Sequence, residues 1–240
     1  ATAACVWTAP KIVVEAETSA QGQLPMRVLS ADEMVAEMGA GWNLGNTMDG
    51  HTGFTPNETL WQNVETTQML IDAVHDYGFN TVRVPVTWGT MIDDENGYAI
   101  NDKWMSRVQD IVDYCVSQDM YVIVNIHHDG AEQSGWLRVG AEDQGPVQEK
   151  FAAVWKQIAE RFKDYDEHVI FESMNEVVGP SDSMDGIILD TQRIMDLNQI
   201  FVDTVRATGS NNAERWLSVP GRYTNIENST KEEVGFDIPK

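Results

Sequence analysis

The feature that most constrains this chain is a series of short runs rich in β-branched residues, separated by stretches with helical periodicity. Near-continuous apolar strands are typical of a parallel sheet that is buried on both faces. The predicted strands span residues 40–44, 79–86, 121–128, 169–175 and 215–219. The predicted helices lie around residues 69–77, 104–115, 151–162 and 194–205, and Ser30 with Glu33 predicts a capping box for a short leading helix. This alternation leaves two architectures, a doubly wound sheet or a (β/α)8 barrel.

Polar residues at the ends of the predicted strands favour the barrel. No Gly-x-Gly-x-x-Gly motif follows the first strand, so the phosphate-binding turn of a dinucleotide-binding sheet is missing. Barrels place their active sites at the carboxyl ends of the strands. The polar residues at those ends are Asn46, Arg83, His127, His128, Asn175 and Glu176. We therefore predict an α/β fold, a (β/α)8 TIM barrel of which this chain supplies about five β/α units. Residues 1–27 form an N-terminal extension, and residues 28–240 form the N-terminal part of a catalytic barrel.

The strand count predicts that further sequence completes the barrel. Five strands are used by Val219, and residues 220–240 cannot hold three more β/α units. We expect a second polypeptide segment, covalent or nicked, to pair with the strands at 40–44 and 215–219. Without it, the sheet keeps two open edges and an uncovered inner face of Val, Ile and Phe. Arg83 would also face a site without its carboxylate partner, which adds a further cost. We therefore expect residues 1–240 alone not to form a stable, active monomer.

Composition excludes several classes of partner. The chain carries 16 Lys and Arg against 38 Asp and Glu, a formal charge of −22, which disfavours nucleic acid and anionic membrane surfaces. No run of about 18 apolar residues is present, so no membrane span is predicted. Two cysteines, Cys5 and Cys115, are too few for a disulfide scaffold, and Cys115 is expected to be a buried thiol. The small residues at positions 1–4 fit either a mature N-terminus after signal removal or an arbitrary boundary.

Four segments at the strand ends carry a family resemblance. They read GWNLGNT at 41–47, NTVRVPVTW at 80–88, NIHH at 125–128 and FESMNE at 171–176. Their order and spacing resemble glycoside hydrolase family 5, in particular its bacterial endoglucanase and xyloglucanase branch, from about residue 29 to 228. The resemblance implies a secreted, retaining, endo-acting hydrolase. It would cleave internal β-1,4-glucosidic bonds of cellulose or related β-glucans, with no cofactor and no metal.

The resemblance also implies roles for three of these side chains. Glu176 would be the general acid/base, which requires a carboxyl group held partly protonated, and burial at the strand end can raise its pKa. Asn175 would hydrogen-bond the sugar 2-OH. Arg83 would support the nucleophilic carboxylate of the seventh strand. The residues themselves leave open a structural ion pair between Arg83 and Glu172, because a buried arginine needs a partner.

The adjacent histidines can be separated by strand geometry. Neighbouring side chains on a strand point to opposite faces, and His127 shares a face with Asn125. We expect His127 to face the barrel interior near the reacting sugar, and His128 to reach the next sugar from the strand end. A zinc site is not expected, because two adjacent histidines without a third ligand at suitable spacing make a poor site.

Tryptophans and one asparagine are the candidates for sugar binding. Pyranose rings expose C–H faces that stack on aromatic rings, while their hydroxyls bond to amides and imidazoles. We expect Trp88 and Trp136 to be stacking platforms, with Trp42 and Trp61 as further candidates; burial in the core is the alternative for each and is favoured for Trp42. Asn46 is expected to bind a sugar hydroxyl.

The residues that would complete the active site are missing from the chain. The family's nucleophilic glutamate, its strand-six His-x-Tyr and its strand-eight tryptophan have no counterpart here. Glu227, Glu232 and Glu233 follow the fifth strand in a polar stretch, so none of them can replace the nucleophile. Two alternatives to the endoglucanase hypothesis stay open: a catalytically silent sugar-binding fragment, and the same barrel acting on xyloglucan or β-mannan.

Overall fold

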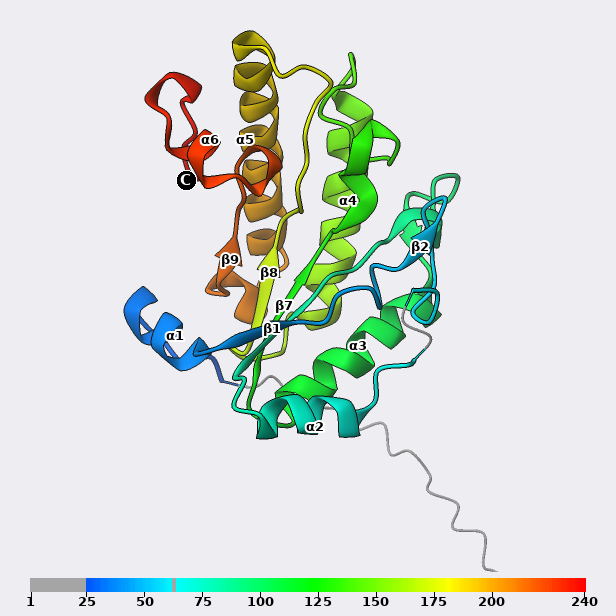
Figure 1. Cartoon of the computed structure of the whole chain (residues 1–240), viewed down its shortest axis with the longest axis vertical. Helices are drawn as coiled ribbons and strands as arrows, with labels where there is room; N and C mark the ends of the chain where they lie inside the picture. The colour runs from blue at the N-terminus through cyan, green and yellow to red at the C-terminus, as the bar shows by residue number, and fades with distance from the viewer. Residues whose placement is uncertain (1–24, 62–63) are drawn as a thin grey trace, which may run out of the picture.

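The computed structural model describes residues 25–61 and 64–240, and its centre is a parallel sheet with the strand order β1-β4-β7-β8-β9 (Figure 1). All four strand pairs are parallel. The strands are β1 (Gly41–Asn43), β4 (Thr81–Val84), β7 (Tyr121–Asn125), β8 (Val169–Glu172) and β9 (Leu217–Ser218). Each lies inside one of the five predicted runs, and the chain order of the strands is also their spatial order, as in a barrel.

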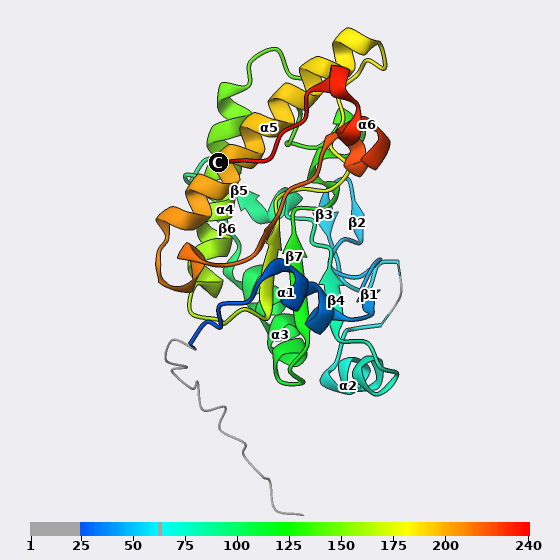
Figure 2. The same cartoon turned by 90° about the vertical axis from the view of Figure 1, so that its left-hand side faces the viewer.

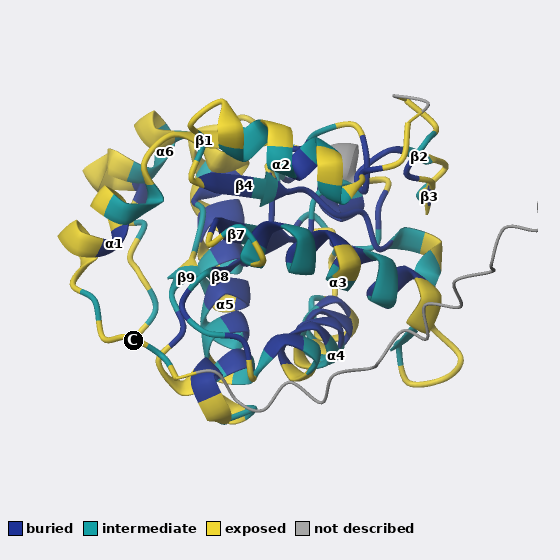
Figure 3. Ribbon diagram, turned by 90° about the horizontal axis from the view of Figure 1, so that it is seen from below, coloured by how far each residue is buried: buried dark blue, intermediate teal, exposed yellow. Residues whose placement is uncertain are grey.

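Four helices follow one another along one face of this sheet (Figures 1 and 3). They are α2 (Gln68–Asp76), α3 (Asp102–Val116), α4 (Gly145–Phe162) and α5 (Met184–Ala207). Two further helices, α1 (Ala31–Met38) and α6 (Ile226–Thr230), lie outside this row. The predicted helices are therefore all present, and the observed ones are longer at their N-terminal ends in α4 and α5.

Short elements decorate the loops between strands and helices. Two hairpins pair β2 (His51–Thr52) with β3 (Thr55–Pro56) and β5 (Ile92–Asp93) with β6 (Ala99–Ile100). The 3-10 helices are η1 (Gly89–Met91), η2 (His128–Gln133), η3 (Ser210–Ala213), η4 (Arg222–Thr224) and η5 (Glu232–Val234). The hairpins and η1, η2 and η4 follow the strands, so they lie at the rim where a barrel carries its chemistry.

The main apolar core lies between the sheet and the row of helices. Val82, Val124 and Phe171 point from alternate strand positions into this layer, where Trp155 of α4 packs against the Phe171 ring at 5.6 Å. The other face of the sheet agrees only in part with our prediction of an inner surface of Val, Ile and Phe. The valines and Phe171 belong to the helix-facing layer, whereas Ile123 and Ile170 lie in register with Arg83 on the inner face. Beside these isoleucines, the inner face carries a polar row joined by hydrogen bonds: Asn43, Arg83, Asn125 and Glu172.

Helix α1 lies beside the lower part of the strands, on the side of the sheet away from the row of helices (Figures 2 and 3). Its capping box is as predicted, since Ser30 and Glu33 each accept a hydrogen bond from the other's backbone N–H. Met34 packs with Tyr121 and Ile170 in a small separate apolar cluster.

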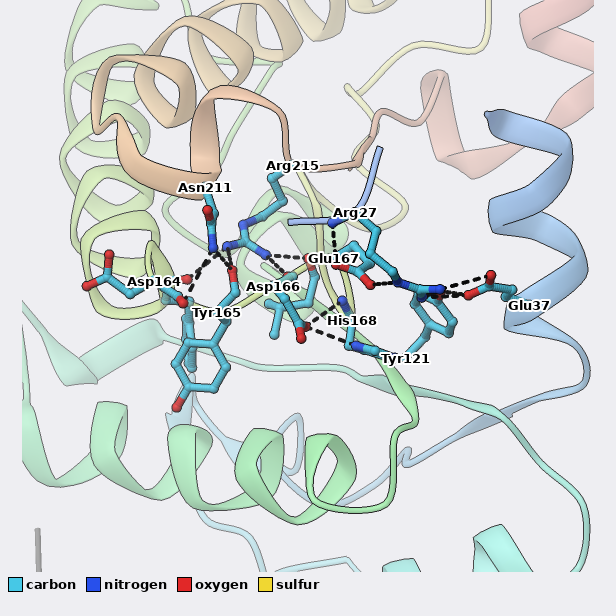
Figure 4. Close-up of polar contacts among 12 residues, drawn as sticks. Arg27, Glu37, Tyr121, Asp164, Tyr165, Asp166, Glu167, His168, Asn211 and Arg215 are labelled. Atoms are coloured by element: carbon cyan, nitrogen blue, oxygen red, sulfur yellow. Dashed lines mark hydrogen bonds and ion pairs between the residues drawn. The ribbon is translucent and has the colours of Figure 1, made fainter. Parts of the chain in front are cut away.

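A polar network ties the segment ahead of α1 to the sheet (Figure 4). The Arg27 guanidinium pairs with Glu167, two residues before the start of β8, and with Glu37 of α1 at 2.7 Å. The Tyr121 hydroxyl donates to the same Glu37 carboxylate at 2.6 Å. Arg27, the last residue of the predicted N-terminal extension, therefore joins the body of the protein. Residues 1–24 of that extension lie outside the described residues.

Two further predictions from the sequence concern the cysteines and membrane-spanning segments. Cys115 is a buried free thiol, and burial raises its pKa to about 12. Cys5 lies outside the described residues. Among the helices that the structure describes, none combines the length and apolar character needed to cross a bilayer.

Candidate active site

The carboxyl ends of the strands bring the predicted polar residues to one rim. Strand register sets Asn43 beside Arg83, and Asn125 beside Glu172. Strand β4 ends at Val84 because Pro85, which follows it, has no N–H to continue the ladder. The chain beyond the strands then supplies His127, His128, Asn175 and Glu176 to the same rim.

Arg83 is the centre of this rim. Its guanidinium reaches past β7 to Glu172 and donates to both carboxylate oxygens, at 2.6 and 2.7 Å. It also donates to the amide oxygens of Asn43 at 3.0 Å and Asn175 at 2.9 Å. Burial opposes the charged form of Arg83, but the hydrogen bonds to Glu172 and the nearby negative charges of Glu172, Glu176 and Asp49 together raise the pKa of the guanidinium. The ion pair left open by the sequence is therefore present, and the expectation that Arg83 lacks a carboxylate partner in this chain is wrong.

Asn125, which carried no predicted role, sets the hydrogen-bonding state of His127. Its Oδ1 accepts from the Val86 N–H at 3.1 Å, so Nδ2 is the atom that faces Glu172 and His127 Nδ1, at 3.3 and 3.2 Å. Burial, reinforced by His128 and Arg83, lowers the pKa of His127 to about 3. The imidazole is thus neutral at ordinary pH. Because Nδ1 accepts, its proton sits on Nε2, where it can be donated to a ligand.

His128 lies against Asp49, a second residue without a predicted role. His128 Nε2 is 3.4 Å from Asp49 Oδ2, and Thr47 N–H donates to the other oxygen at 2.9 Å. Burial would raise the pKa of Asp49, but the hydrogen bond from His128 holds it below its usual value. The side chains of Asp49, His127 and His128 place ligand atoms within 4.8 Å of one another, so a third candidate metal ligand does exist. The hydrogen bond from Asn125 to His127 Nδ1 nevertheless favours a hydrogen-bonding triad over a metal site.

Asn175 and Glu176 follow β8 at the same level. The Asn175 N–H donates to the Ile126 carbonyl at 3.0 Å, and its Oδ1 is occupied by Arg83, so its side-chain NH2 group is left to meet a ligand. Glu176 is exposed, whereas the sequence analysis expected burial of its carboxyl group at the strand end. Its φ of 47° lies in the left-handed region, and its N–H donates to Thr224 Oγ1 at 2.9 Å. This backbone turn carries the carboxylate out of the strand direction and onto the rim.

The two tryptophans predicted as stacking platforms differ in exposure. Trp88 is completely buried and donates its indole N–H to the Asn125 carbonyl at 3.1 Å, so the prediction that it stacks on a sugar is wrong. Trp136 is half-buried, donates to Asp129 Oδ1 at 2.7 Å, and has the Lys150 amine 5.0 Å from its ring centre. It lines a separate open cavity of about 810 Å³ between η1, β6 and α4. The stacking role of Trp136 stays a prediction.

Trp61 is the exposed aromatic side chain beside the histidines. It is 43% exposed, and its ring lies 5.7 Å from His128 and 5.4 Å from His51. Trp42 is partly buried and packs against the main core, which was the favoured alternative for it. Asn46 is exposed on the rim with a φ of 62°. Its sugar-binding role stays a prediction.

Comparison with known proteins identifies the family. The model of cellulase (glycosyl hydrolase family 5) matches residues 45–240. The chain belongs to this family. Endoglucanase A of Paenibacillus barcinonensis is 44% identical over 221 residues, which cover 89% of this chain and 54% of that protein.

Solved structures of the family superpose closely on this chain. A family 5 xyloglucanase from Paenibacillus pabuli, in complex with ligand, has a TM-score of 0.82 at 44% identity, over 86% of this chain and 58% of that one. A broad specificity endoglucanase from Ruminococcus champanellensis with bound cellotriose has a TM-score of 0.82 at 41% identity, over 90% and 64%. This family 5 chain therefore spans between about half and two thirds of the length of these three relatives. Its five parallel strands form part of a (β/α)8 barrel, as predicted.

Sequence reasoning missed several members of the site. Asp49 and Thr224 lie in loops with no periodicity to mark them, and their contacts with His128 and Glu176 bridge 79 and 48 residues of the chain. Asn125 could have been found, because it shares strand parity with His127 and stands among apolar residues.

Proposed function

We propose that this family 5 domain belongs to a retaining endo-β-1,4-glucanase in which Glu176 is the general acid/base. The observation that carries the proposal is the arrangement at the end of β8. An exposed carboxylate follows an asparagine whose amide oxygen is occupied by Arg83. The carboxyl group can thus reach a bound glycosidic oxygen, and the adjacent amide presents its N–H groups to the same sugar.

The proposed chemistry follows from the donors at the rim. In the first step, the Glu176 carboxyl group gives its proton to the leaving glycosidic oxygen; in the second, its carboxylate activates water. The Asn175 NH2 group donates to the 2-OH, a contact that strengthens as positive charge develops on the sugar ring. The His127 Nε2–H donates to a hydroxyl of the same sugar. The Asn175 and His127 side chains thus both donate hydrogen bonds to uncharged hydroxyl groups.

Retention requires a second carboxylate about 5–5.5 Å from the first, to act as nucleophile. Glu172 is held by both of its oxygens in the pair with Arg83 and faces Asn125 as well, so it is committed to positioning. We propose that the nucleophile comes from further barrel strands, on another segment. Two facts support this proposal: among the described strands, β1 and β9 each pair along one edge only, and the relatives extend well beyond the matched region.

The proposed substrate is a β-1,4-linked glucan cut inside the chain. Relatives are named as endoglucanases, one structural neighbour is a xyloglucanase, and another holds cellotriose. Trp61 offers an exposed ring beside His51 and His128 for stacking on a glucose unit. Xyloglucan is the second candidate substrate. Because such polymers stay outside cells, we also propose that the protein is secreted.

The test is Glu176→Gln in the enzyme that contains this chain, with Glu227→Gln of α6, an exposed glutamate, as the matched control. We expect hydrolysis of unactivated β-glucan to fall by about 10²–10⁴-fold in the first variant and to be unchanged in the second. Release of an activated phenol leaving group should be spared, because that group needs no proton. Equal loss on both kinds of substrate would contradict the acid/base role, and an α-configured first product by NMR would contradict retention.

A further inference from the structure

The backbone at Glu176 adopts a conformation that few residues with a side chain accept. Its φ of 47° lies in the left-handed region, which disfavours L residues other than glycine and, to a lesser degree, asparagine and aspartate. Such a conformation persists only where neighbouring groups hold it. The contact that holds it comes from far along the chain: Thr224 Oγ1, in η4 after β9, accepts the Glu176 N–H at 2.9 Å.

A second hydrogen bond runs between the same two segments. The Tyr223 N–H donates to the Val177 carbonyl at 3.0 Å, next to the first contact in both segments. Tyr223 and Thr224 have φ values of 57° and 49°, so the η4 turn is itself held in the left-handed region. Two strained turns thus brace each other, one carrying the candidate acid/base.

Helix α5 anchors both turns through one buried carboxylate. Asp190 is 3% exposed, and its Oδ2 accepts from Arg222 Nε at 2.9 Å and from the Gly179 N–H at 2.8 Å. Arg222 is 5% exposed and also donates to Asp182 at 2.9 Å. The segment after Glu176 and the segment before Thr224 are therefore fastened to the same atom of α5.

We propose that Thr224 is a positioning residue for Glu176, with Arg222 and Asp190 as its anchor. The inference rests on the proposed function, since it concerns the orientation of the acid/base. Thr224 is exposed and its hydroxyl holds the peptide N–H of Glu176, so its part is to aim the carboxyl group at the glycosidic oxygen. Displacement of a catalytic group by about 1 Å can reduce a rate by about 10²-fold.

The experiment compares Thr224→Val with Thr224→Ser in the enzyme that contains this chain. Valine keeps the β-branched shape and removes the hydroxyl, whereas serine keeps the hydroxyl. The matched control is Thr230→Val in neighbouring α6, where the hydroxyl donates to the Ile226 carbonyl of its own helix at 2.9 Å. For unactivated β-glucan, we expect kcat of Thr224→Val to fall by about 10–100-fold with KM little changed. Serine should restore most of the rate, and an activated aryl substrate should lose far less.

A readout that does not depend on turnover is amide hydrogen exchange. We expect the Glu176 N–H to exchange faster in Thr224→Val than in the wild type or in Thr230→Val. The outcomes separate the two proposals. If Glu176→Gln leaves β-glucan hydrolysis intact, the proposed function is wrong. If Glu176→Gln inactivates the enzyme but Thr224→Val behaves as Thr230→Val does, the positioning role is overturned. Equal losses on both kinds of substrate, without rescue by serine, would also overturn it.

Discussion

At the scale of single residues, the site is organised by amides whose orientation is forced. Asn125 and Asn175 each have the side-chain oxygen occupied, by the Val86 N–H and by Arg83 respectively. Both amides must therefore present N–H groups, and Asn125 passes that constraint on to the His127 ring. A rim of fixed donors is suited to a ligand that offers hydroxyl oxygens.

The first prediction concerns the titration of His127. Its pKa in the folded protein lies far below the value of about 6.5 for an unperturbed imidazole, with burial as the main cause. Below about pH 6.5 the unfolded chain therefore binds a proton at His127 that the folded chain does not bind. The contribution of neutral His127 to the free energy of unfolding is complete above about pH 6.5. It is lost as the pH falls toward 3, by up to about 1.4 kcal/mol per pH unit.

NMR of the imidazole nitrogens checks this directly. We expect no titration of His127 between about pH 5 and 8, with its proton on Nε2 throughout. His168 is the internal control, because its hydrogen bond with Asp166 raises its pKa and it must titrate above the usual range. A His127 midpoint near 6.5 would contradict the prediction.

Residue-level prediction succeeded where a motif combined chemistry with position. Arg83, His127, Asn175 and Glu176 lie at the rim as expected, because they interrupt apolar strands or end them, and their catalytic roles stay predictions. The stacking role predicted for Trp88 was wrong, because the sequence around a strand end does not show whether a tryptophan ring turns to the rim or into the core. Thr224 gave no local signal at all, since its role exists only through a contact with Glu176.

At the scale of elements, Arg215 joins four segments around the lower end of the sheet. It is completely buried, and its guanidinium donates to the carbonyls of Phe162, Tyr165, Asp166 and Val169 and to Asn212 Oδ1 (Figure 4). Burial lowers its pKa to about 10, so it stays charged at neutral pH. The end of α4, the start of β8 and the entry to β9 therefore depend on one side chain.

We expect Arg215→Met to lower the free energy of unfolding by at least about 3 kcal/mol, because several buried carbonyls lose their donor at once. Arg161→Met is the control, since Arg161 pairs with exposed Asp102 at 2.5 Å and such surface pairs contribute about 0–1 kcal/mol. Urea unfolding of both variants measures the difference. Similar losses would mean that the carbonyls find other donors.

Element boundaries show where pattern-based prediction stops. The predicted strand at 79–86 is observed as 81–84, and the one at 169–175 as 169–172. The shortening has a physical cause in β4, where Pro85 cannot donate to the ladder. After β8, the chain leaves the sheet to carry Asn175 and Glu176 onto the rim. Apolar patterning continues through both regions, so it cannot mark these ends.

At the scale of the whole molecule, one partial barrel combines a large negative charge with the site that we propose for a neutral ligand. The formal charge is −22, yet at the rim the charges of Arg83 and Glu172 face each other in a two-point pair. The polar row on the inner face also explains how this part of the sheet tolerates water, on a side where Ile123 and Ile170 are the apolar residues in register with Arg83. The prediction that residues 1–240 need further strands for activity remains, because it depends on the position of the nucleophile.

The pairing of Arg83 with Glu172 has a consequence for how binding responds to ionic strength. A neutral oligosaccharide meets fixed hydrogen-bond donors and a self-neutralised ion pair, so no counterions are released on binding. The Debye length shrinks from about 30 Å at 0.01 M to about 3 Å at 1 M salt. We expect the Kd for a cello-oligosaccharide, measured by calorimetry on Glu176→Gln enzyme, to change by less than about twofold across that range, because uncharged partners feel no screening. Adsorption of the same protein to a polycationic surface should weaken strongly over the same range of salt concentration. A Kd for the oligosaccharide that changed in parallel would contradict the prediction, because it would mean that the net charge of the protein affects sugar binding.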